Sequence, residues 1–336
     1  MKINNKLKSR VKIVADRERK FSSPNASLIR KLWSWQHGFS SGFSDMLKLN
    51  KDNIHHYLDQ VTYAQYHPFN GIYSRFLDNK AFLPAILPAE YTTDIHVVYF
   101  KGELNYSGVA EKKNTINYLR EFVSHQPLAS KSLSGGGGDS LKIISAHNFE
   151  DYIKKVQTEK KSVLLSEKVI QHEYSSSVFP ETVNTIRVIL MRDPIDGRVF
   201  LPVAFHRFGT RFSVPVDNVG KGGFLCPVDF DSGQLSDGFI FRNEIFGWNS
   251  IHPDTGKRFS EISIPGWREI AGKIIHHFNQ SDWFQYGGLD VVVTKNGFKI
   301  LEINSLPDCS TAQILQPFFQ SEKIKRFFIS KGIVPH

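Results

Sequence analysis

The sequence predicts an α+β protein in which antiparallel hairpins alternate with separate helices. The clearest hairpin is YGGLDVVVTKNGFKILEINSLPD, residues 286–308. Its first half is apolar and β-branched, Asn296-Gly297 is a turn dipeptide, and its second half alternates in polarity. A second hairpin is predicted by NTIRVILMRD and RVFLPVAFHRF, which flank a turn containing Pro, Asp and Gly. Apolar residues at helical spacing predict helices over 114–125 and from Pro265 onward.

The composition is that of a globular protein with a substantial core. The chain has 336 residues, of which 40% are hydrophobic and 13% aromatic, enough for one large or two ordinary domains. No apolar run approaches the roughly 18 residues of a membrane span, and the basic N-terminus lacks the apolar segment of a signal peptide. We therefore expect a cytoplasmic protein. Cys226 and Cys309 are isolated, which argues against a disulfide scaffold or a zinc site.

The charge balance favours anionic partners. There are 42 Lys and Arg against 33 Asp and Glu, a net charge of +9, which suits nucleotides, acidic glycans, nucleic acid or a membrane surface. The excess is concentrated in the first 31 residues, where SLIRKLWSWQHGF sets apolar residues beside Arg30 and Lys31. This segment either rests on an anionic bilayer, at the inner face of the membrane, or docks onto the core. Basic and aromatic residues are not interleaved on one element, which argues against nucleic acid.

The order of these patterns divides the chain into three parts. Residues 1–78 are predicted to form a helical N-terminal extension, in which Asn53 to Val61 is the clearest helix. Residues 79–165 contain a strand, an amphipathic helix and a Gly-rich loop. Residues 166–336 contain the two hairpins and a later helix.

Two acids and an amide mark the main hairpin. A three-residue loop at 295–297 would make Asp290 face Glu302, whereas a two-residue loop would shift the register by one and separate them. Asn304 shares the side of Glu302. Carboxylates in an apolar hairpin need a cationic partner if they are buried. That partner is either Mg²⁺, which takes one or two carboxylates plus nucleotide phosphates, or Arg and Lys side chains.

A Gly-rich loop in QPLASKSLSGGGGDSLKII is the second informative feature. Glycines let a backbone approach a phosphate closely and present several N–H groups to it, and a nearby lysine adds positive charge. The loop is not a Walker A motif, because it leads into a strand and not into a helix. The alternative is a flexible linker. The residues concerned are Lys131, Gly135, Gly136, Gly137 and Gly138.

An arginine within the second hairpin also needs a partner. Arg187 points opposite to Ile186 and Val188 in an apolar strand, so it requires an anion, either a neighbouring carboxylate or a phosphate. Farther along, VDNVGKGGF forms a second Gly-rich turn that contains Lys221.

Together these segments resemble the ATP-grasp superfamily, and within it the sugar-transfer-associated ATP-grasp group, which is labelled glutamate-ligase-related or hexapeptide-transferase-like. The resemblance covers about 79–310 and rests on the order of DNKAFLPAIL, SKSLSGGGGDSLK, LLSEKVIQHE, ETVNTIRVIL and FHRFGTRFSVPVDNVGKGGF. The segment LLSEKVIQHE is similar to the hinge between the two subdomains of the family. The pattern Asp…Glu-x-Asn downstream of such a loop and hinge is a fairly specific motif, whereas the Gly-rich loop alone is a weak motif. The resemblance implies an ATP-grasp fold in which two α+β subdomains, 79–165 and 166–336, grip the nucleotide.

The resemblance also implies roles for individual residues. ATP would be bound by residues of the loop, the hinge and the second Gly-rich turn: Lys80, Lys131, Gly135 to Gly138, Glu167, Lys168, Val169, Glu173 and Asn218. Within this set, Glu167 and the backbone near Val169 would hold adenine and Glu173 the ribose. The implied catalytic residues are Arg187, Arg207 and Lys221, and the implied Mg²⁺ ligands are Asp290, Glu302 and Asn304.

Four positions depart from the family pattern. Ser132 replaces a frequent Pro, Ser140 replaces a frequent Gly, and Asp139 puts an acid beside the expected phosphates. Leu306 stands where biotin carboxylase has a substrate-contacting Arg, which argues against carboxylation of biotin.

The function implied is ATP- and Mg²⁺-dependent ligation. A small carboxylate donor would be activated as an acyl phosphate, and an amine or related nucleophile would attack it, in the modification of a sugar of a bacterial surface polysaccharide. Two alternatives remain open: an ATP-grasp kinase that phosphorylates a hydroxyl, and a non-catalytic module that binds an acidic glycan or a membrane. The donor, the acceptor and the oligomeric state are not fixed by the sequence.

Overall fold

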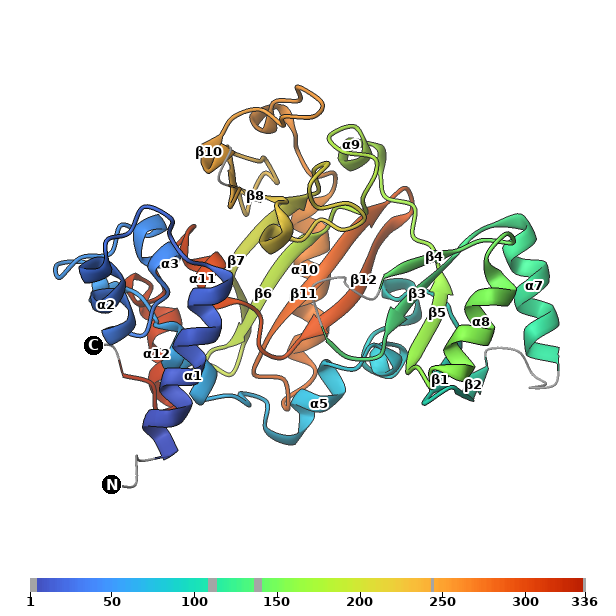
Figure 1. Ribbon diagram of the computed structural model, residues 1–336, viewed down its shortest axis with the longest axis horizontal. Helices are drawn as coiled ribbons and strands as arrows, with labels where there is room; N and C mark the ends of the chain where they lie inside the picture. Colours follow the sequence, from blue (N-terminus) through green and yellow to red (C-terminus); the bar gives the residue numbers. More distant parts are fainter. Residues whose placement is uncertain (1–4, 108–113, 136–140, 243–244, 335–336) are drawn as a thin grey trace.

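Two antiparallel sheets organise the part of the chain that the computed structural model describes, residues 5–107, 114–135, 141–242 and 245–334 (Figure 1). The smaller sheet has the order β2-β1-β5-β3-β4 and the larger β10-β9-β8-β7-β6-β11-β12. This is the predicted α+β architecture. The strands are β1 (Ile95–Phe100), β2 (Glu103–Ser107), β3 (Leu128–Ser132), β4 (Lys142–Ile144), β5 (Val163–Glu167), β6 (Ile186–Arg192), β7 (Val199–Phe208), β8 (Phe224–Pro227), β9 (Gly238–Ile240), β10 (Gly247–Asn249), β11 (Tyr286–Thr294) and β12 (Gly297–Asn304).

The helices surround these sheets. They are α1 (Asn5–Lys20), α2 (Leu28–Gln36), α3 (Ser41–Met46), α4 (Gln60–Gln65), α5 (Ser74–Leu77), α6 (Leu83–Ile86), α7 (Thr115–His125), α8 (Phe149–Thr158), α9 (Glu173–Ser176), α10 (Trp267–Asn279), α11 (Cys309–Gln313) and α12 (Glu322–Ser330). No helix among the described residues is long and apolar enough to cross a membrane.

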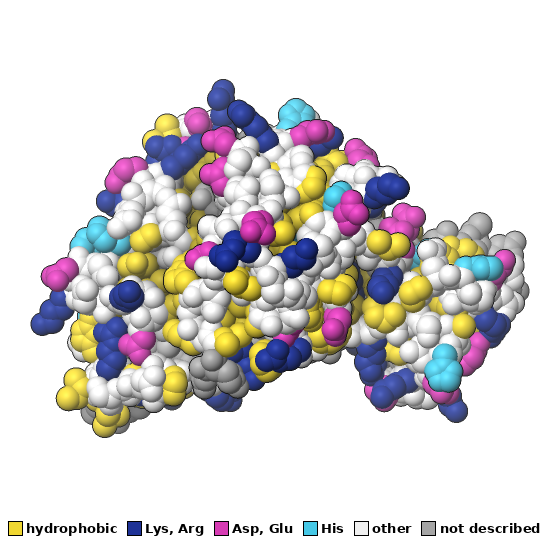
Figure 2. Space-filling model, turned by 90° about the horizontal axis from the view of Figure 1, so that it is seen from above, with side chains coloured by type: hydrophobic (Ala, Val, Ile, Leu, Met, Phe, Trp, Pro, Cys, Tyr) yellow, Lys and Arg dark blue, Asp and Glu magenta, His cyan; other side chains and the backbone are white. Residues whose placement is uncertain are grey.

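The smaller sheet packs against α7 and α8. In α8 the buried residues Phe149, Ile153 and Val156 recur at helical spacing, and they meet Leu128 and Leu165 of the sheet. This core is separate from the cores of the larger sheet. The smaller sheet and its two helices therefore form a lobe beside the rest of the molecule (Figures 1 and 2).

The larger sheet is covered on both faces. On one face lies α10, whose Trp267, Ile270, Ile274 and Phe278 are buried at the spacing predicted from the sequence. The other core combines residues from both ends of the chain: Leu58, Tyr63, Phe69, Phe318, Ile324, Phe327 and Phe328. The N-terminal extension thus helps to cover the larger sheet.

The extension is helical, as predicted, but one of its helices lies elsewhere. The expected helix over Asn53 to Val61 is wrong, since this segment contains a short 3-10 turn and α4 begins only at Gln60. The reason is a cap: the Asp59 carboxylate accepts hydrogen bonds from the backbone N–H groups of Val61 and Thr62.

Helix α2 combines the two possibilities left open for the basic N-terminal segment. Trp33 packs against a small core formed by Phe39 and its neighbours. On the same helix Leu28, Ile29 and Leu32 are 69%, 81% and 52% exposed. The helix is therefore docked along one side and exposes apolar residues along another.

The main hairpin has the expected pairing of Asp290 with Glu302, but its loop is shorter than expected and a bulge compensates for the difference. Thr294 pairs with Gly297, so the loop has two residues, which alone would place Asp290 and Glu302 out of register. A bulge restores the pairing: Val291 faces Ile300, and Asp290 faces Glu302, with Leu301 as the extra residue. The two acids therefore lie opposite each other, as the three-residue loop had predicted.

Candidate active site

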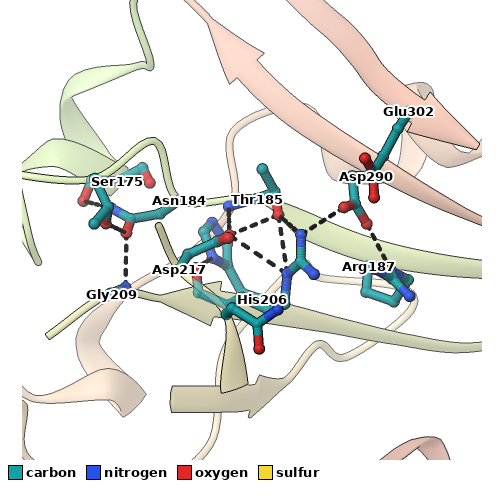
Figure 3. Close-up of polar contacts among 12 residues, drawn as sticks. Ser175, Asn184, Thr185, Arg187, His206, Gly209, Asp217, Asp290 and Glu302 are labelled. Atoms are coloured by element: carbon teal, nitrogen blue, oxygen red, sulfur yellow. Dashed lines mark hydrogen bonds and ion pairs between the residues drawn. The ribbon is translucent and has the colours of Figure 1, made fainter. Parts of the chain in front are cut away.

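The site is built around the carboxylate of Asp290 on β11. Asp290 is paired with Glu302 of β12 on one side and with Arg187 of β6 on the other. One carboxylate oxygen, Oδ1, lies 2.6 Å from Arg187 Nε, and the other, Oδ2, lies 2.8 Å from a terminal guanidinium nitrogen of Arg207 (Figure 3). The anion that Arg187 requires is thus a neighbouring carboxylate.

Asp290 is ionised in this environment. Burial alone favours the neutral acid, but the guanidinium groups of Arg187 and Arg207 outweigh burial and lower the pKa of this carboxyl. Only 5% of the residue is exposed. Asp290 offsets only part of the charge of the two guanidinium groups, and a second acid, Asp217, also contacts Arg207.

A second buried acid, Asp217, contacts both Arg207 and Thr185. Asp217 lies 3.4 Å from Arg207 Nε, and the hydroxyl and backbone N–H of Thr185 both donate to Asp217 Oδ2 over 2.7 Å. Arg207 also donates to the Thr185 hydroxyl oxygen (Figure 3). Burial raises the pKa of Asp217, against the opposing effects of Arg207 and Thr185. These contacts fix the guanidinium in position at the cavity wall.

Close packing beneath Arg187 explains a glycine of the hairpin. A Cβ at Gly288 would lie 2.5 Å from Pro307 Cβ and 3.3 Å from Arg187 Cδ. Pro307 is held in turn by Tyr63, whose hydroxyl donates to its carbonyl over 2.5 Å. A side chain at position 288 would therefore displace either Pro307 or the arginine.

Lys80 links the larger sheet to the Gly-rich loop. Its ammonium lies 2.9 Å from Glu302 Oε2 and donates to the Gly135 carbonyl over 2.9 Å. Its backbone N–H donates to the carbonyl of Leu133. Lys80 therefore connects the hairpin to the end of β3, which belongs to the other sheet.

Lys131 on β3 is the most perturbed lysine of the cavity. Burial lowers its pKa to about 8, assisted by the nearby Lys80 and opposed by Glu302 and Asp290. Its ammonium is thus easily deprotonated. An anion bound beside it would favour the charged form.

One cavity brings together most of the residues singled out from the sequence. Nine of them line it: Lys80, Lys131, Gly135, Arg187, Arg207, Asn218, Asp290, Glu302 and Asn304. They come from both sheets, from the loop after β3, from the 3-10 turn Lys80–Phe82 and from the turn after β7. The cavity therefore lies between the two lobes.

The other predicted residues that the structure describes lie elsewhere. Glu167, Lys168, Val169 and Glu173 line a different hollow, together with the hairpin turn at Lys295. Lys221 ends the short 3-10 turn Val219–Lys221 and is not among the described residues that line the cavity. Gly136, Gly137 and Gly138, with the departures Asp139 and Ser140, lie outside the described residues.

Sequence reasoning missed two polar residues of the cavity, Thr185 and Asp217. Both stand next to residues that were noted, in the segments NTIR and VDN. For Asp217 the available signal was an acid among apolar residues and next to the predicted site residue Asn218. A third buried group, His206, accompanies them, and burial lowers its pKa to about 3, so the ring is neutral.

The donors at the end of the hairpin suit a magnesium ion. Asp290 and Glu302 offer carboxylate oxygens from paired positions. Asn304 donates its amide N–H to Glu302 Oε1 over 3.0 Å, which turns its own oxygen toward other partners. No group of three or more His, Cys, Asp or Glu suited to a metal occurs in the described parts of the chain. Two carboxylates and an amide are ligand types that Mg²⁺ takes, together with phosphates and water. In this structure the four carboxylate oxygens already meet Arg187, Arg207, Lys80 and Asn304, so an ion there would share them with these partners.

The chemical capacity of this cavity is to hold a polyanion. Four cations, Lys80, Lys131, Arg187 and Arg207, line it together with three acids, Asp217, Asp290 and Glu302, each of which forms an ion pair with one or two of them. Such a set positions phosphate groups and stabilises charge that shifts during transfer.

Several solved structures resemble this chain. An N5-carboxyaminoimidazole ribonucleotide synthetase in complex with ADP is 13% identical, with a TM-score of 0.39, over 70% of this chain and 46% of its own. D-alanine–D-alanine ligase from Bacillus anthracis is 13% identical, with a TM-score of 0.42, over 76% and 67%. A D-cycloserine synthetase is 12% identical, with a TM-score of 0.41, over 75% and 68%. This chain thus spans less than half of the first of these structures.

No curated protein matches the chain. A family model does match, over residues 77–321, and its description is sugar-transfer associated ATP-grasp. This match includes every residue that we have placed in the cavity. It confirms the family that the motifs resembled and the fold class expected from them. The chain therefore belongs to the sugar-transfer associated ATP-grasp family.

Proposed function

We propose that the protein is an ATP- and Mg²⁺-dependent ligase that joins a carboxylate to an amine or a related nucleophile through an acyl phosphate. The observation that carries this proposal is the cavity between the lobes, where Lys80, Lys131, Arg187 and Arg207 converge on the acids of one hairpin. Family membership supports the choice of nucleotide.

Each side chain has a distinct task in this proposal. Lys80 and Lys131 bind the phosphates of ATP, with the backbone at Gly135 beside them. Mg²⁺ held by the hairpin oxygens would offset phosphate charge. Arg187 and Arg207 bind the substrate carboxylate next to the γ-phosphate and stabilise the charge as the phosphoryl group moves to a carboxylate oxygen. The nucleophile then attacks the carbonyl carbon, and phosphate leaves.

The hollow at the hinge is the proposed site of the nucleoside. Glu167 ends β5 and Glu173 begins α9, and both line it. Adenine would lie against the backbone near Val169 and the ribose near Glu173. The acceptor that we propose, a sugar of a bacterial surface polysaccharide, rests on the family's association with sugar transfer.

Nucleotide binding is tested by thermal unfolding of the full chain with Mg²⁺ and a non-hydrolysable ATP analogue. A ligand at about 100 times its dissociation constant adds roughly 2.7 kcal/mol of stability to the native protein. We expect this gain to be lost in Lys131→Ala and Glu302→Gln and kept in Lys154→Ala, an exposed lysine of α8. No gain in the native protein would contradict the proposal.

The affinity for the analogue is expected to depend on pH through Lys131. Because its pKa is about 8, the ammonium is mostly charged at pH 7.5 and mostly neutral at pH 9. Affinity for the phosphates therefore falls by roughly tenfold over this interval. Lys131→Arg keeps its charge and is expected to show a flat profile in titration calorimetry. An equal decline in Lys131→Arg would assign the effect to another group.

The ligase and kinase alternatives differ in their products. With ATP, Mg²⁺, a panel of amino acids and uronic acids, and hydroxylamine as a general nucleophile, an acyl phosphate is trapped as a hydroxamate. We expect ADP and hydroxamate in equal amounts, measured by chromatography and mass spectrometry. A product that retains the phosphoryl group would show a kinase and overturn the ligase assignment.

A peripheral membrane contact is a second proposal, carried by the exposed apolar side of α2. Leu28, Ile29 and Leu32 are exposed beside Arg30 and Lys31, and basic side chains lie among apolar ones at this end of the molecule (Figure 2). This pattern is typical of helices that rest on anionic bilayers. Such a contact would hold the enzyme at the inner face of the membrane, or it would be the function of a non-catalytic module.

Co-sedimentation with vesicles tests this contact. We expect the full chain to bind vesicles of phosphatidylglycerol and phosphatidylcholine, and to bind less at high salt, because the attraction is electrostatic. Ile29→Glu is expected to abolish binding. The matched control is Ile195→Glu, since Ile195 is equally exposed, at 77%, in a turn between two strands. Equal loss in both variants would refute a specific role for α2.

A further inference from the structure

A second hollow adjoins the cavity between the lobes, and the N-terminal helix forms one of its walls. We call it the α1 groove. It is lined by Arg17 and Lys20 of α1, by Phe21 and Phe241, and by Arg187 and Arg207. The two arginines also line the cavity, as does Asn218. The α1 groove therefore opens at the point where the substrate carboxylate meets the γ-phosphate in the proposed reaction.

The groove continues outward into a third hollow. Lys20, Phe21, Gly220 and Phe241 line both, and the outer hollow extends to Phe246. Phe246 is 53% exposed. The three hollows thus follow one another from the buried pair of arginines to the surface beside α1. This path suits an elongated molecule better than a single small acid.

Charge along this path is predominantly positive. The cations that line the two outer hollows are Arg17, Arg19, Lys20, Arg187 and Arg207, against the acids Asp45 and Asp308. Both acids already have partners: Asp45 lies 2.9 Å from Arg30 Nε, and Asp308 lies 3.7 Å from Arg17 and caps α11. Four of the cations have acidic partners too, since Arg17 contacts Asp308, Arg19 contacts Asp16, and Arg187 and Arg207 share Asp290. An anionic occupant is favoured by the excess of cations over acids among the residues that line the path.

Aromatic rings accompany these cations. Phe21 meets Phe241 edge to face, with ring centroids 6.3 Å apart, and Phe241 lies 6.2 Å from Phe246 in the same arrangement. Partly exposed aromatic faces contact the C–H faces of sugar rings, while arginine forks bind carboxylate or phosphate groups. Cations beside aromatic rings along an extended path are therefore the chemistry of an acidic saccharide site.

We propose that the α1 groove binds an acidic oligosaccharide, with one end at Arg187 and Arg207 and its charged groups along Arg17 and Lys20. This inference rests on the proposed function, whose sugar substrate it specifies as anionic and longer than one residue. Helix α1 precedes the family match at 77–321, so this wall of the groove is contributed by the chain's own extension.

Titration calorimetry of the full chain with tetragalacturonate tests the inference. The double variant Arg17→Glu, Lys20→Glu is expected to bind at least about tenfold more weakly than the native chain, because two charge-assisted contacts become repulsive. The control Lys8→Glu, Lys12→Glu makes the same change in net charge on the same helix, at exposed lysines that line neither outer hollow. It is expected to bind as the native chain does.

Two further probes decide the class of ligand. Maltotetraose has the same length without charge, and tetraglutamate has the charge without sugar rings. Binding of maltotetraose as tight as that of tetragalacturonate would overturn the role of the cations. Equal or tighter binding of tetraglutamate would overturn the choice of a saccharide, and no binding of tetragalacturonate would overturn the site itself.

Thermal unfolding with Mg²⁺ and the ATP analogue, on the same variants, separates this inference from the proposed function. If the groove variant loses tetragalacturonate but keeps the stabilisation by the nucleotide, the two sites are distinct and both proposals stand. If the native chain binds tetragalacturonate and gains nothing from the nucleotide, the groove stands and the ligase falls. Melting without ligand shows whether each variant is folded.

Discussion

One buried carboxylate, shared by two arginines, organises the centre of this protein. Asp290 draws Arg187 from β6 and Arg207 from β7 to one point of the larger sheet. Removing one partner from such a buried group typically costs about 3–5 kcal/mol, since an uncompensated charge is left behind. Several neighbours serve this arrangement: Asp217 and Thr185 hold Arg207 in place, and Gly288 leaves room for Arg187. The result is a fixed pair of guanidinium groups whose combined charge exceeds that of the acid between them.

The part of the cavity that Lys80 and Lys131 line depends on contact between the lobes. Each sheet has its own core, so little apolar packing fixes one lobe against the other at the cavity. Polar contacts of Lys80 bridge this boundary, since it reaches both Glu302 of the hairpin and the Gly135 carbonyl of the loop. Lys131, whose pKa burial lowers to about 8, faces the same space from the smaller sheet. A polyanion between the lobes would satisfy both lysines and draw the two sheets together.

The N-terminal extension belongs structurally to the larger sheet. Leu58, Tyr63 and Phe69 complete a core with the C-terminal helices, and Figure 1 shows α1 beside α11, whose N-cap Asp308 lies 3.7 Å from Arg17. Two functional surfaces follow from this placement. The inner side of α1 sets Arg17 and Lys20 beside Arg187 and Arg207, and α2 exposes apolar residues at the outer end. In our proposals the same segment both binds the acidic saccharide, through α1, and contacts the membrane, through α2.

The sequence by itself determined the hairpins, the helical extension, the family and the residues that converge in the cavity, because alternation, turn dipeptides and unpaired charges are local signals. It required an anion for Arg187 and a cation for Asp290, but only tertiary structure showed that each satisfies the other. The length of the hairpin loop did not determine the register, because a bulge at Leu301 shifts the pairing of β11 with β12 by one residue. Thr185 and Asp217 were missed for the same reason: their role arises from contact with Arg207, which is distant in sequence from Thr185. The packing of the two sheets and of both ends of the chain decided which of the two hollows each predicted residue lines. It also placed α1 at the wall of a groove. No local sequence pattern encodes this packing.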